Sequence, residues 1–521
     1  MPTRSIARIM KVLPRSAWVR REPARLPRRL HARGKNVTGK APPARCEGQG
    51  RSPGRSNHMA PDVKLQSENS SSSPGSASRR SFVKGLGAAG VALPSLAMLP
   101  RWGFAEDVAA TYANAAIDWK QFAGQTITLA GAIHPWSNAI TPLLWDFTKL
   151  TGISVVTDFR LETTFLGALP IQLNRGGGTP DVFMYTTYGQ GISNGWLEPL
   201  NAYYSEKSLT DLGWYDENDL LRTARAFPVW QGGERYAMPI TSEAVTLFIN
   251  GDALTAKNLP VPQIFDELLV TANAIKTDEM SGIAMRAQAG GNSSVPAMSF
   301  VFSYGGDMVK DNKAAFASPE AIAAIEMFGR LLSQAGSRGV SGYEWYHVLD
   351  EFLQRKTAIA IDSSNFATDI SNPAKSNVAS QAVFAAFPHL PGRTSVPFMS
   401  HWQACINSRS RNKRAAFLFL LWATSKPTSL RTAAAGLATT RVSAWSSEGF
   451  KKAFGAQAAE AALTNLQNAD VDRAKAILFH SLSRPILDAF MIGVNEVVSG
   501  ANPAKIAMTN AAAKANAAIR G

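Results

Sequence analysis

The chain has 521 residues, 45% of them hydrophobic, which is long enough for two or three domains with cores of their own. Its formal net charge of +15 is confined to the beginning. Residues 1–105 carry 20 Lys and Arg against 4 Asp and Glu, whereas residues 106–521 carry 34 against 35. The near-neutral body excludes nucleic-acid binding through a broad basic surface.

The first 105 residues have the pattern of a leader. Residues 1–58 are rich in Arg and Pro and show no apolar periodicity, so we expect no packed core there. Met59 offers an alternative start, which would make residues 1–58 a product of a mis-annotated start codon. The segment SRRSFVK at 78–84 precedes a weakly apolar run at 85–99, a pattern typical of a twin-arginine export signal.

Small residues at 103 and 105 predict cleavage after Ala105, and therefore a periplasmic protein. A membrane anchor fits less well, because the apolar run is short and contains Pro94. The two cysteines, Cys46 and Cys405, leave one thiol and no internal disulfide after cleavage. The longest apolar run of the body, Ala415 to Ala423, is too short to span a membrane.

The first part of the body alternates strands and helices. We expect strands at 125–132, 153–159 and 181–185, and helices at 140–150 and 165–173, with a loop at 134–137 and a kink or break at Pro170. Such alternation predicts a parallel sheet in an α/β lobe.

The stretch from Tyr236 to Asn250 divides the body. Residues 244–250 are β-branched, aromatic or aliphatic and predict a strand buried on both faces, with Glu243 at its mouth. The pattern fits either a crossing between two lobes or an ordinary central strand. Beyond it we expect helices at 262–275, 319–334, 346–355 and 413–424, strands at 357–361, 382–387 and 397–406, and an Ala-rich helical tail from 428.

A family resemblance rests on the order of several segments: FTKLTGISV, RGGGTPDVFMY, GWLEPL, YAMPITSEAVTLFINGDAL, TAIAIDSS and RNKRAAFLFLLWATS. In that order they resemble the bacterial extracellular solute-binding proteins of carbohydrate ABC transporters, the maltose-binding-protein-like group. The resemblance implies an α/β, type II-like periplasmic-binding-protein fold with two lobes, crossing hinge strands and a central cleft. It also implies a monomer without a cofactor that delivers a sugar or polyol to permease subunits in the inner membrane.

The resemblance places crossings near 243–247 and 384–390. Residues 122–242 plus 388–427 would then form one lobe, and residues 248–383 plus 428–521 the other.

Candidate ligand-binding residues follow from two rules. Sugars need aromatic faces and fixed polar groups, and ligands gather beyond the carboxyl ends of parallel strands. We add the acid at the first crossing and a loop that resembles a ligand-facing loop of the family. The candidates are then Trp136, Ser137, Tyr185, Tyr188, Glu243, Asn292, Ser293, Asp362, Ser363, Asn365 and Trp402. We expect Trp145, Trp214 and Trp422 to lie in the core and Arg441 to be solvated.

Alternatives remain open at this point. The aromatic and neutral candidates favour an uncharged carbohydrate over a polyamine or a glycerol phosphate, which would need converging acids or arginines. Residues 191–195, GISNG, match the G-x-S-x-G pattern, so a secreted hydrolase using Ser193 is an enzymatic alternative. The glycine-rich GLGAAG at 85–90 lies inside the export signal with no strand before it, and the scattered histidines predict no metal site.

Overall fold

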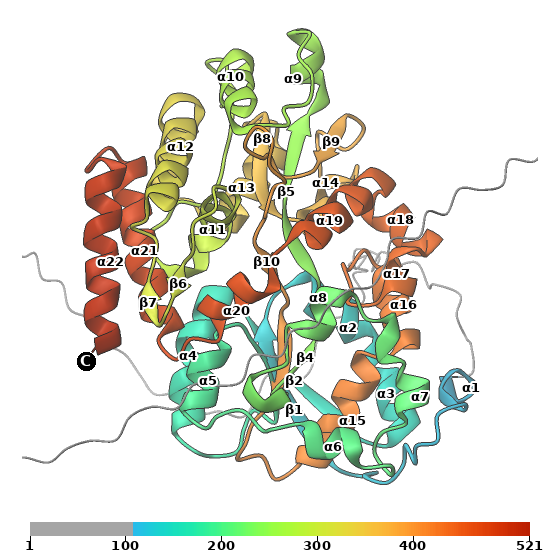
Figure 1. Cartoon of the computed structure of the whole chain (residues 1–521). Helices are drawn as coiled ribbons and strands as arrows, with labels where there is room; N and C mark the ends of the chain where they lie inside the picture. Colours follow the sequence, from blue (N-terminus) through green and yellow to red (C-terminus); the bar gives the residue numbers. More distant parts are fainter. Residues whose placement is uncertain (1–107, 521) are drawn as a thin grey trace, which may run out of the picture. The chain divides into compact units, whose positions relative to one another are not determined.

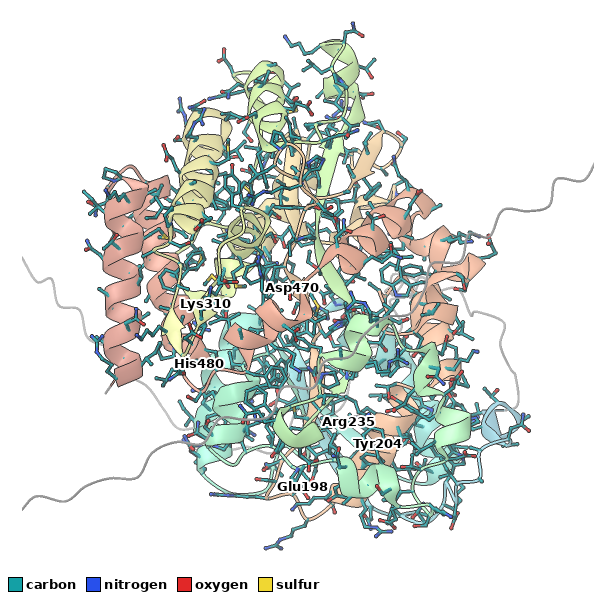
Figure 2. All side chains as sticks on the ribbon, in the orientation of Figure 1. Glu198, Tyr204, Arg235, Lys310, Asp470 and His480 are labelled. Atoms are coloured by element: carbon teal, nitrogen blue, oxygen red, sulfur yellow. The ribbon has the colours of Figure 1, made fainter. Side chains whose placement is uncertain are left out.

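The computed structural model describes residues 108–520, so the predicted export signal and the predicted cleavage site after Ala105 lie outside the described residues. The described chain contains two main sheets (Figure 1). We call the part built on the five-stranded sheet the first lobe and the part built on the four-stranded sheet the second lobe. Side chains fill both lobes (Figure 2). One contact of the first lobe is the cation–π pair of Arg235 and Tyr204, whose guanidinium and ring centroid lie 4.8 Å apart.

The first lobe has a mixed sheet with strand order β2-β1-β3-β11-β4. These strands are β1 (Thr126–Ala132), β2 (Ser154–Arg160), β3 (Val182–Tyr185), β4 (Met238–Pro239) and β11 (Gln403–Ile406). β1 pairs in parallel with β2 and β3, as the alternation of strands and helices predicts. β11 runs antiparallel to β3 and β4, so a late segment of the chain completes the sheet.

The second lobe is built around β5 (Glu243–Asn250), every residue of which is buried, as the sequence predicts. β5 pairs antiparallel with β8 (Ile359–Ser363), β9 (Ala382–Ala385) and β10 (Met399–Ser400). Because β8 is antiparallel to β5, its carboxyl end lies beside the amino end of β5, with Ser363 opposite Val245. The carboxyl end of β8 therefore lies where the chain enters the second lobe from the first lobe. A separate hairpin joins β6 (Val309–Lys310) and β7 (Lys313–Ala314).

Helices cover both sheets (Figure 1). In chain order they are α1 (Val108–Tyr112), α2 (Pro135–Ile140), α3 (Leu144–Thr151), α4 (Glu162–Asn174), α5 (Tyr188–Ser193), α6 (Asn201–Ser205), α7 (Leu212–Tyr215), α8 (Arg222–Ala226), α9 (Gly251–Ala256), α10 (Phe265–Ile275), α11 (Ser294–Ser303), α12 (Pro319–Ala335), α13 (Trp345–Leu353), α14 (Phe366–Ile370), α15 (Lys413–Ala423), α16 (Lys426–Ala434), α17 (Val442–Trp445), α18 (Glu448–Phe454), α19 (Ala456–Asn468), α20 (Val471–Leu478), α21 (Ser483–Val498) and α22 (Ala504–Arg520). Among the described residues no single helix has the length and apolarity of a membrane span; α20 and α21 reach both only together, across a bend of 103°.

The chain passes between the sheets twice. The first passage lies between β4 and β5, at 240–242, and the second between β10 and β11, at 401–402. The two passages are hydrogen-bonded to each other, since the Ile240 amide donates to the Trp402 carbonyl at 2.8 Å. The sequence analysis placed the second passage near 384–390. Because β9 at 382–385 pairs with β5, the chain is still in the second lobe there.

Three local features differ from the sequence predictions. The expected loop at 134–137 is the start of α2, because Pro135 fits the first helical turn and the His134 ring accepts a hydrogen bond from the Trp136 amide. α4 continues through Pro170, since its apolar residues pack on the sheet and outweigh the one missing hydrogen bond. The predicted strand at 397–406 is interrupted by the second passage.

Two side chains lie elsewhere than expected. Trp145 is 62% exposed, because it points away from the face of α3 that buries Phe147 and Leu150, and Lys149 covers its ring. Arg441 is completely buried rather than solvated. Its side chain donates to the carbonyl oxygens of Thr424 and Asp216 at 2.8 and 2.9 Å, which compensates the guanidinium for the loss of water.

Candidate functional site

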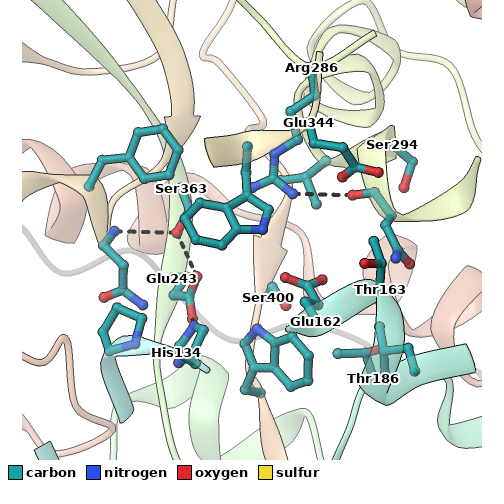
Figure 3. A pocket seen from close by; sticks show the side chains of 18 of the residues that line it. His134, Glu162, Thr163, Thr186, Glu243, Arg286, Ser294, Glu344, Ser363 and Ser400 are labelled. Atoms are coloured by element: carbon teal, nitrogen blue, oxygen red, sulfur yellow. Dashed lines mark hydrogen bonds and ion pairs between the residues drawn. The ribbon is translucent and has the colours of Figure 1, made fainter. Parts of the chain in front are cut away.

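A pocket of about 770 Å³ lies between the two sheets and is lined by residues of both lobes. The size lies within the range of small-molecule sites, roughly 300–1,000 Å³. Its wall includes the strand ends after β1, β3 and β8, the beginning of β5, and the second passage. Sequence positions that are far apart therefore meet at one cavity (Figure 3).

Some of the predicted site residues lie on the pocket wall and the others do not. The residues on the wall are Tyr185, Glu243, Asn292, Ser363, Asn365 and Trp402. The residues away from it are Trp136, Ser137, Tyr188, Ser293 and Asp362, each of which is buried.

The residues away from the wall are held by other contacts. The Ser137 hydroxyl caps α2 by accepting from the His134 amide at 2.9 Å, and it donates to the His134 carbonyl at 2.8 Å. Trp136 on the same helix is 1% exposed. The Tyr188 hydroxyl contacts the carbonyl oxygens of Tyr185 and His401 at 2.8 and 2.7 Å. Strand-end position alone selected these side chains, but the direction of each side chain turns it into the protein interior.

Glu243 connects three parts of the site. Its carboxylate accepts hydrogen bonds from Ser363 of β8 at 2.5 Å and from Thr241 of the first passage at 2.8 Å, and it lies 3.3 Å from Nε2 of His134 after β1. Because His134 Nδ1 accepts from the Trp136 amide, Nε2 carries the proton that is donated to Glu243. Burial would raise the pKa of Glu243, but these hydrogen bonds outweigh it and hold the pKa below its ordinary value.

Arg286 lines the pocket and is bound to Asp362, which is buried behind the wall. Its Nε donates to Oδ2 of Asp362 at 2.7 Å, and its Nη2 contacts Oδ1. Its Nη1 donates to the carbonyl of Asn292 at 3.1 Å and so fixes the loop before α11. Burial opposes the charge of Arg286, but Asp362 more than compensates and raises the pKa of the guanidinium.

The charged groups on the wall do not balance. The wall cations Arg286, Lys375 and Arg484 pair with Asp362, Asp369 and Asp488, respectively. The wall carboxylates of Glu162 and Glu344 have no cation within 4.0 Å among residues 108–520. The pocket therefore carries negative charge, because its cations are committed elsewhere.

Aromatic and amide groups complete the wall. Trp402, on the passage next to the first lobe, and Trp345, at the start of α13 in the second lobe, both line the pocket. Asn365 is 7% exposed, and among the described residues neither its amide nitrogen nor its amide oxygen has a hydrogen-bond partner. A buried amide without partners costs free energy, so a group bound in the pocket would relieve that cost.

Sequence reasoning missed His134, Glu162, Arg286, Glu344 and Trp345 on this wall. His134 directly follows β1, so the strand-end rule could have selected it with Trp136. The other four begin helices or lie in extended chain, where charged and aromatic residues have no pattern that distinguishes a pocket from a surface.

Comparisons with known proteins now identify the family. Residues 133–428 match the model of the bacterial extracellular solute-binding protein family, which is more than half of the chain. The chain belongs to this family. An erythritol/L-threitol-binding protein of Mycolicibacterium smegmatis is 25% identical over 371 residues, 67% of this chain and 78% of the relative.

Solved structures share the fold of this solute-binding protein. A solute-binding protein of Agrobacterium radiobacter K84 in complex with ribitol has a TM-score of 0.69 at 22% identity, covering 76% of this chain and 99% of its own. One of Agrobacterium vitis S4 with bound D-mannitol has a TM-score of 0.66 at 24% identity, covering 76% and 98%. The predicted two-lobed periplasmic-binding-protein fold is confirmed.

The serine of the G-x-S-x-G match lies outside the pocket. Ser193 is the last residue of α5, is exposed, and is not on the pocket wall. The nucleophile pattern requires a sharp turn directly between a strand and a helix, and Ser193 is inside a helix instead. Within residues 108–520, no group of three or more His, Cys, Asp and Glu residues is arranged to hold a metal ion.

Proposed function

We propose that this protein is the solute-binding component of an ABC importer, which captures an uncharged polyol or sugar between its lobes and delivers it to permease subunits in the inner membrane. The observation that carries the proposal is the pocket between the two sheets, with Trp402 and Trp345 on its wall. Flat apolar rings and fixed polar groups suit the alternating C–H and hydroxyl groups of such solutes. The erythritol/L-threitol-binding relative supports the polyol class.

The charge of the pocket argues against anionic solutes. A glycerol phosphate held by arginine needs a free guanidinium, and both arginines on the wall are already paired with acids. At the starts of α4 and α13, the carboxylates of Glu162 and Glu344 would repel a phosphate. A polyamine remains a competitor, because Glu162 and Glu344 are unpaired carboxylates. The aromatic walls and the amide of Asn365 favour the uncharged solute.

Solute binding would act through lobe closure. A solute that touches both lobes stabilises the closed form relative to the open one, which shifts the population towards it. We propose that the hinge includes the two passages at 240–242 and 401–402, and that the protein works as a periplasmic monomer after twin-arginine export and cleavage near Ala105.

The lobe boundaries also remain a proposal. Residues 122–242 plus 388–427 and residues 248–383 plus 428–521 were assigned from the sequence. Thr428 and Arg431 contact Tyr112 and Asp146 of the first lobe at 2.8 and 2.6 Å, and Ser443 contacts Asp219 there. These contacts favour extending the first lobe through at least Ser443.

A polyol should stabilise the full-length chain against heat. At about 100 times its dissociation constant, a ligand that binds only the folded state adds about 2.7 kcal/mol to the free energy of unfolding. A thermal-shift screen should include erythritol, ribitol, D-mannitol, maltose, spermidine and glycerol 3-phosphate. A shift given only by the charged compounds would contradict the proposal.

Substituting Asn365 with alanine should weaken the binding of the polyol without lowering the stability of the ligand-free protein. We expect the dissociation constant for the polyol to rise about tenfold or more, because the amide loses its bonds to hydroxyl groups. The free energy of unfolding without ligand should not fall, since the amide has no partner to lose.

The matched control is Asn407→Ala, another buried asparagine. Its amide donates to the Pro180 carbonyl at 3.1 Å and accepts from the Arg409 amide at 3.0 Å, away from the pocket. Asn407→Ala should therefore lower stability by about 1–3 kcal/mol without changing the affinity. Equal affinities for the wild-type protein and Asn365→Ala would remove Asn365 from the site.

A further inference from the structure

Two carboxylates face the pocket from opposite lobes. Glu162 is the first residue of α4 in the first lobe, and Glu344 immediately precedes α13 in the second. Figure 3 shows Glu162 on the first-lobe side of the pocket, with Arg286 and Glu344 coming from the second-lobe side. Neither acid belongs to the candidate set that the sequence patterns select.

Within residues 108–520, neither of these acids has a cationic partner. Within the described part of the chain, the Glu162 carboxylate has no hydrogen-bond donor and neither acid has an ion-pair partner. Arg286 is the nearby cation, but its Nε and Nη2 are occupied by Asp362 and its Nη1 by the Asn292 carbonyl. The guanidinium therefore lowers the cost of the two charges without bonding to either.

Burial and like charge act together on this pair. Burial raises the pKa of Glu162; the charge of Arg286 opposes the rise, and the charges of Glu344 and Glu243 add to it. Burial likewise raises the pKa of Glu344, against the opposing charge of Arg286. A donor placed between the two carboxylates would relieve both costs.

A buried amide elsewhere on the pocket wall offers the solute a donor and an acceptor. Asn365, on the same wall, is more than nine-tenths buried with both amide atoms unpartnered. An amide that shares the pocket with two carboxylates matches hydroxyl groups, which donate and accept, better than it matches a purely cationic group.

We propose that Glu162 and Glu344 form a pair of acceptors across the cleft that binds two hydroxyl groups of the solute and excludes solutes with a carboxylate or phosphate. This inference rests on the proposed function and makes it more specific. Hydroxyl donors to a charged carboxylate form short, strong hydrogen bonds. Each lobe contributes one acceptor, so the pair also helps a polyol to hold the lobes together.

A matched series of six-carbon solutes tests the pair on the full-length chain. D-glucitol, D-gluconate and D-glucamine share a hydroxylated chain and differ at one end, as a hydroxyl, a carboxylate and an ammonium group. Isothermal titration calorimetry should compare the wild-type protein, Glu162→Gln, Glu344→Gln and the double variant. The control is Glu448→Gln, whose side chain is 91% exposed.

For D-glucitol we expect each single variant to raise the dissociation constant about tenfold, because glutamine replaces a charged acceptor with a neutral one. The double variant should bind D-gluconate measurably, whereas the wild-type protein should not. A gain of binding for an anion does not follow from mere loosening of the fold, so this readout is specific to the charge of the pair.

Three results would overturn the inference. If D-glucitol binds the wild-type protein and both single variants within twofold of the Glu448→Gln control, the pair is not a ligand site, although the proposed function stands. If D-glucamine binds the wild-type protein at least tenfold more tightly than D-glucitol, the acids recognise a cation instead. If neither D-glucitol nor any polyol of the thermal-shift screen binds, the proposed function and this inference both fail.

Discussion

Substituting Arg286 with alanine is expected to lower the free energy of unfolding by about 3–5 kcal/mol, because it leaves a buried carboxylate without its cation. Asp362 is completely buried, and two guanidinium nitrogens contact its two oxygens. After the substitution, the remaining hydrogen bond to Asp362 is the 2.6 Å contact from the Ser363 amide. Chemical denaturation of the ligand-free protein at neutral pH measures the loss.

Two further variants distinguish burial from charge. Arg355 and Asp252 form an exposed ion pair at 3.0 Å, so Arg355→Ala should cost only about 0–1 kcal/mol. Replacing Arg286 with methionine and Asp362 with leucine together should restore most of the stability that Arg286→Ala loses, since no unpaired charge remains. A loss of less than 1 kcal/mol for Arg286→Ala would show that water reaches Asp362 and that the pair is not sealed.

Acid should weaken the hinge through His401, by about 3 kcal/mol between pH 7 and pH 4. His401 lies on the second passage, is fully buried, and its Nδ1 donates to the Thr241 carbonyl of the first passage at 2.8 Å. Its Nε2 has no hydrogen-bond partner within residues 108–520. Burial lowers the pKa of His401 from 6.5 to about 4; the Thr241 carbonyl and the charge of Glu243 oppose that shift without cancelling it.

The sign follows from proton uptake. Between pH 6.5 and about 4 the unfolded chain binds a proton that the folded protein does not, so stability falls as the pH falls through this window. His401→Asn should start from a lower stability at pH 7 but lose about 2–3 kcal/mol less than the wild-type protein on acidification to pH 4. Urea unfolding at both pH values measures the difference, and equal losses in the two proteins would show that His401 does not titrate in this window.

The site could be predicted from the sequence only where the backbone decides the position of the side chain. Tyr185 ends β3 and Ser363 ends β8, and both line the pocket. Asp362, one residue before Ser363 on the same strand, points to the other side and pairs with Arg286. Neighbouring residues of one strand therefore have different roles, since Ser363 lines the pocket and Asp362 is buried in an ion pair. The residue types alone do not reveal which of the two faces the pocket.

The sequence by itself determined most of the strands and long helices, and the order of segments that indicates the family. Those features depend on local residue preferences and on hydrophobic periodicity, which are readable along one segment. Only the tertiary structure decided that the second passage lies at 401–402, that Trp136 is buried, and that Glu162 and Glu344 face one cavity. These facts depend on the packing of segments distant in the chain, which fixes side-chain direction and pairs charges that no local pattern connects.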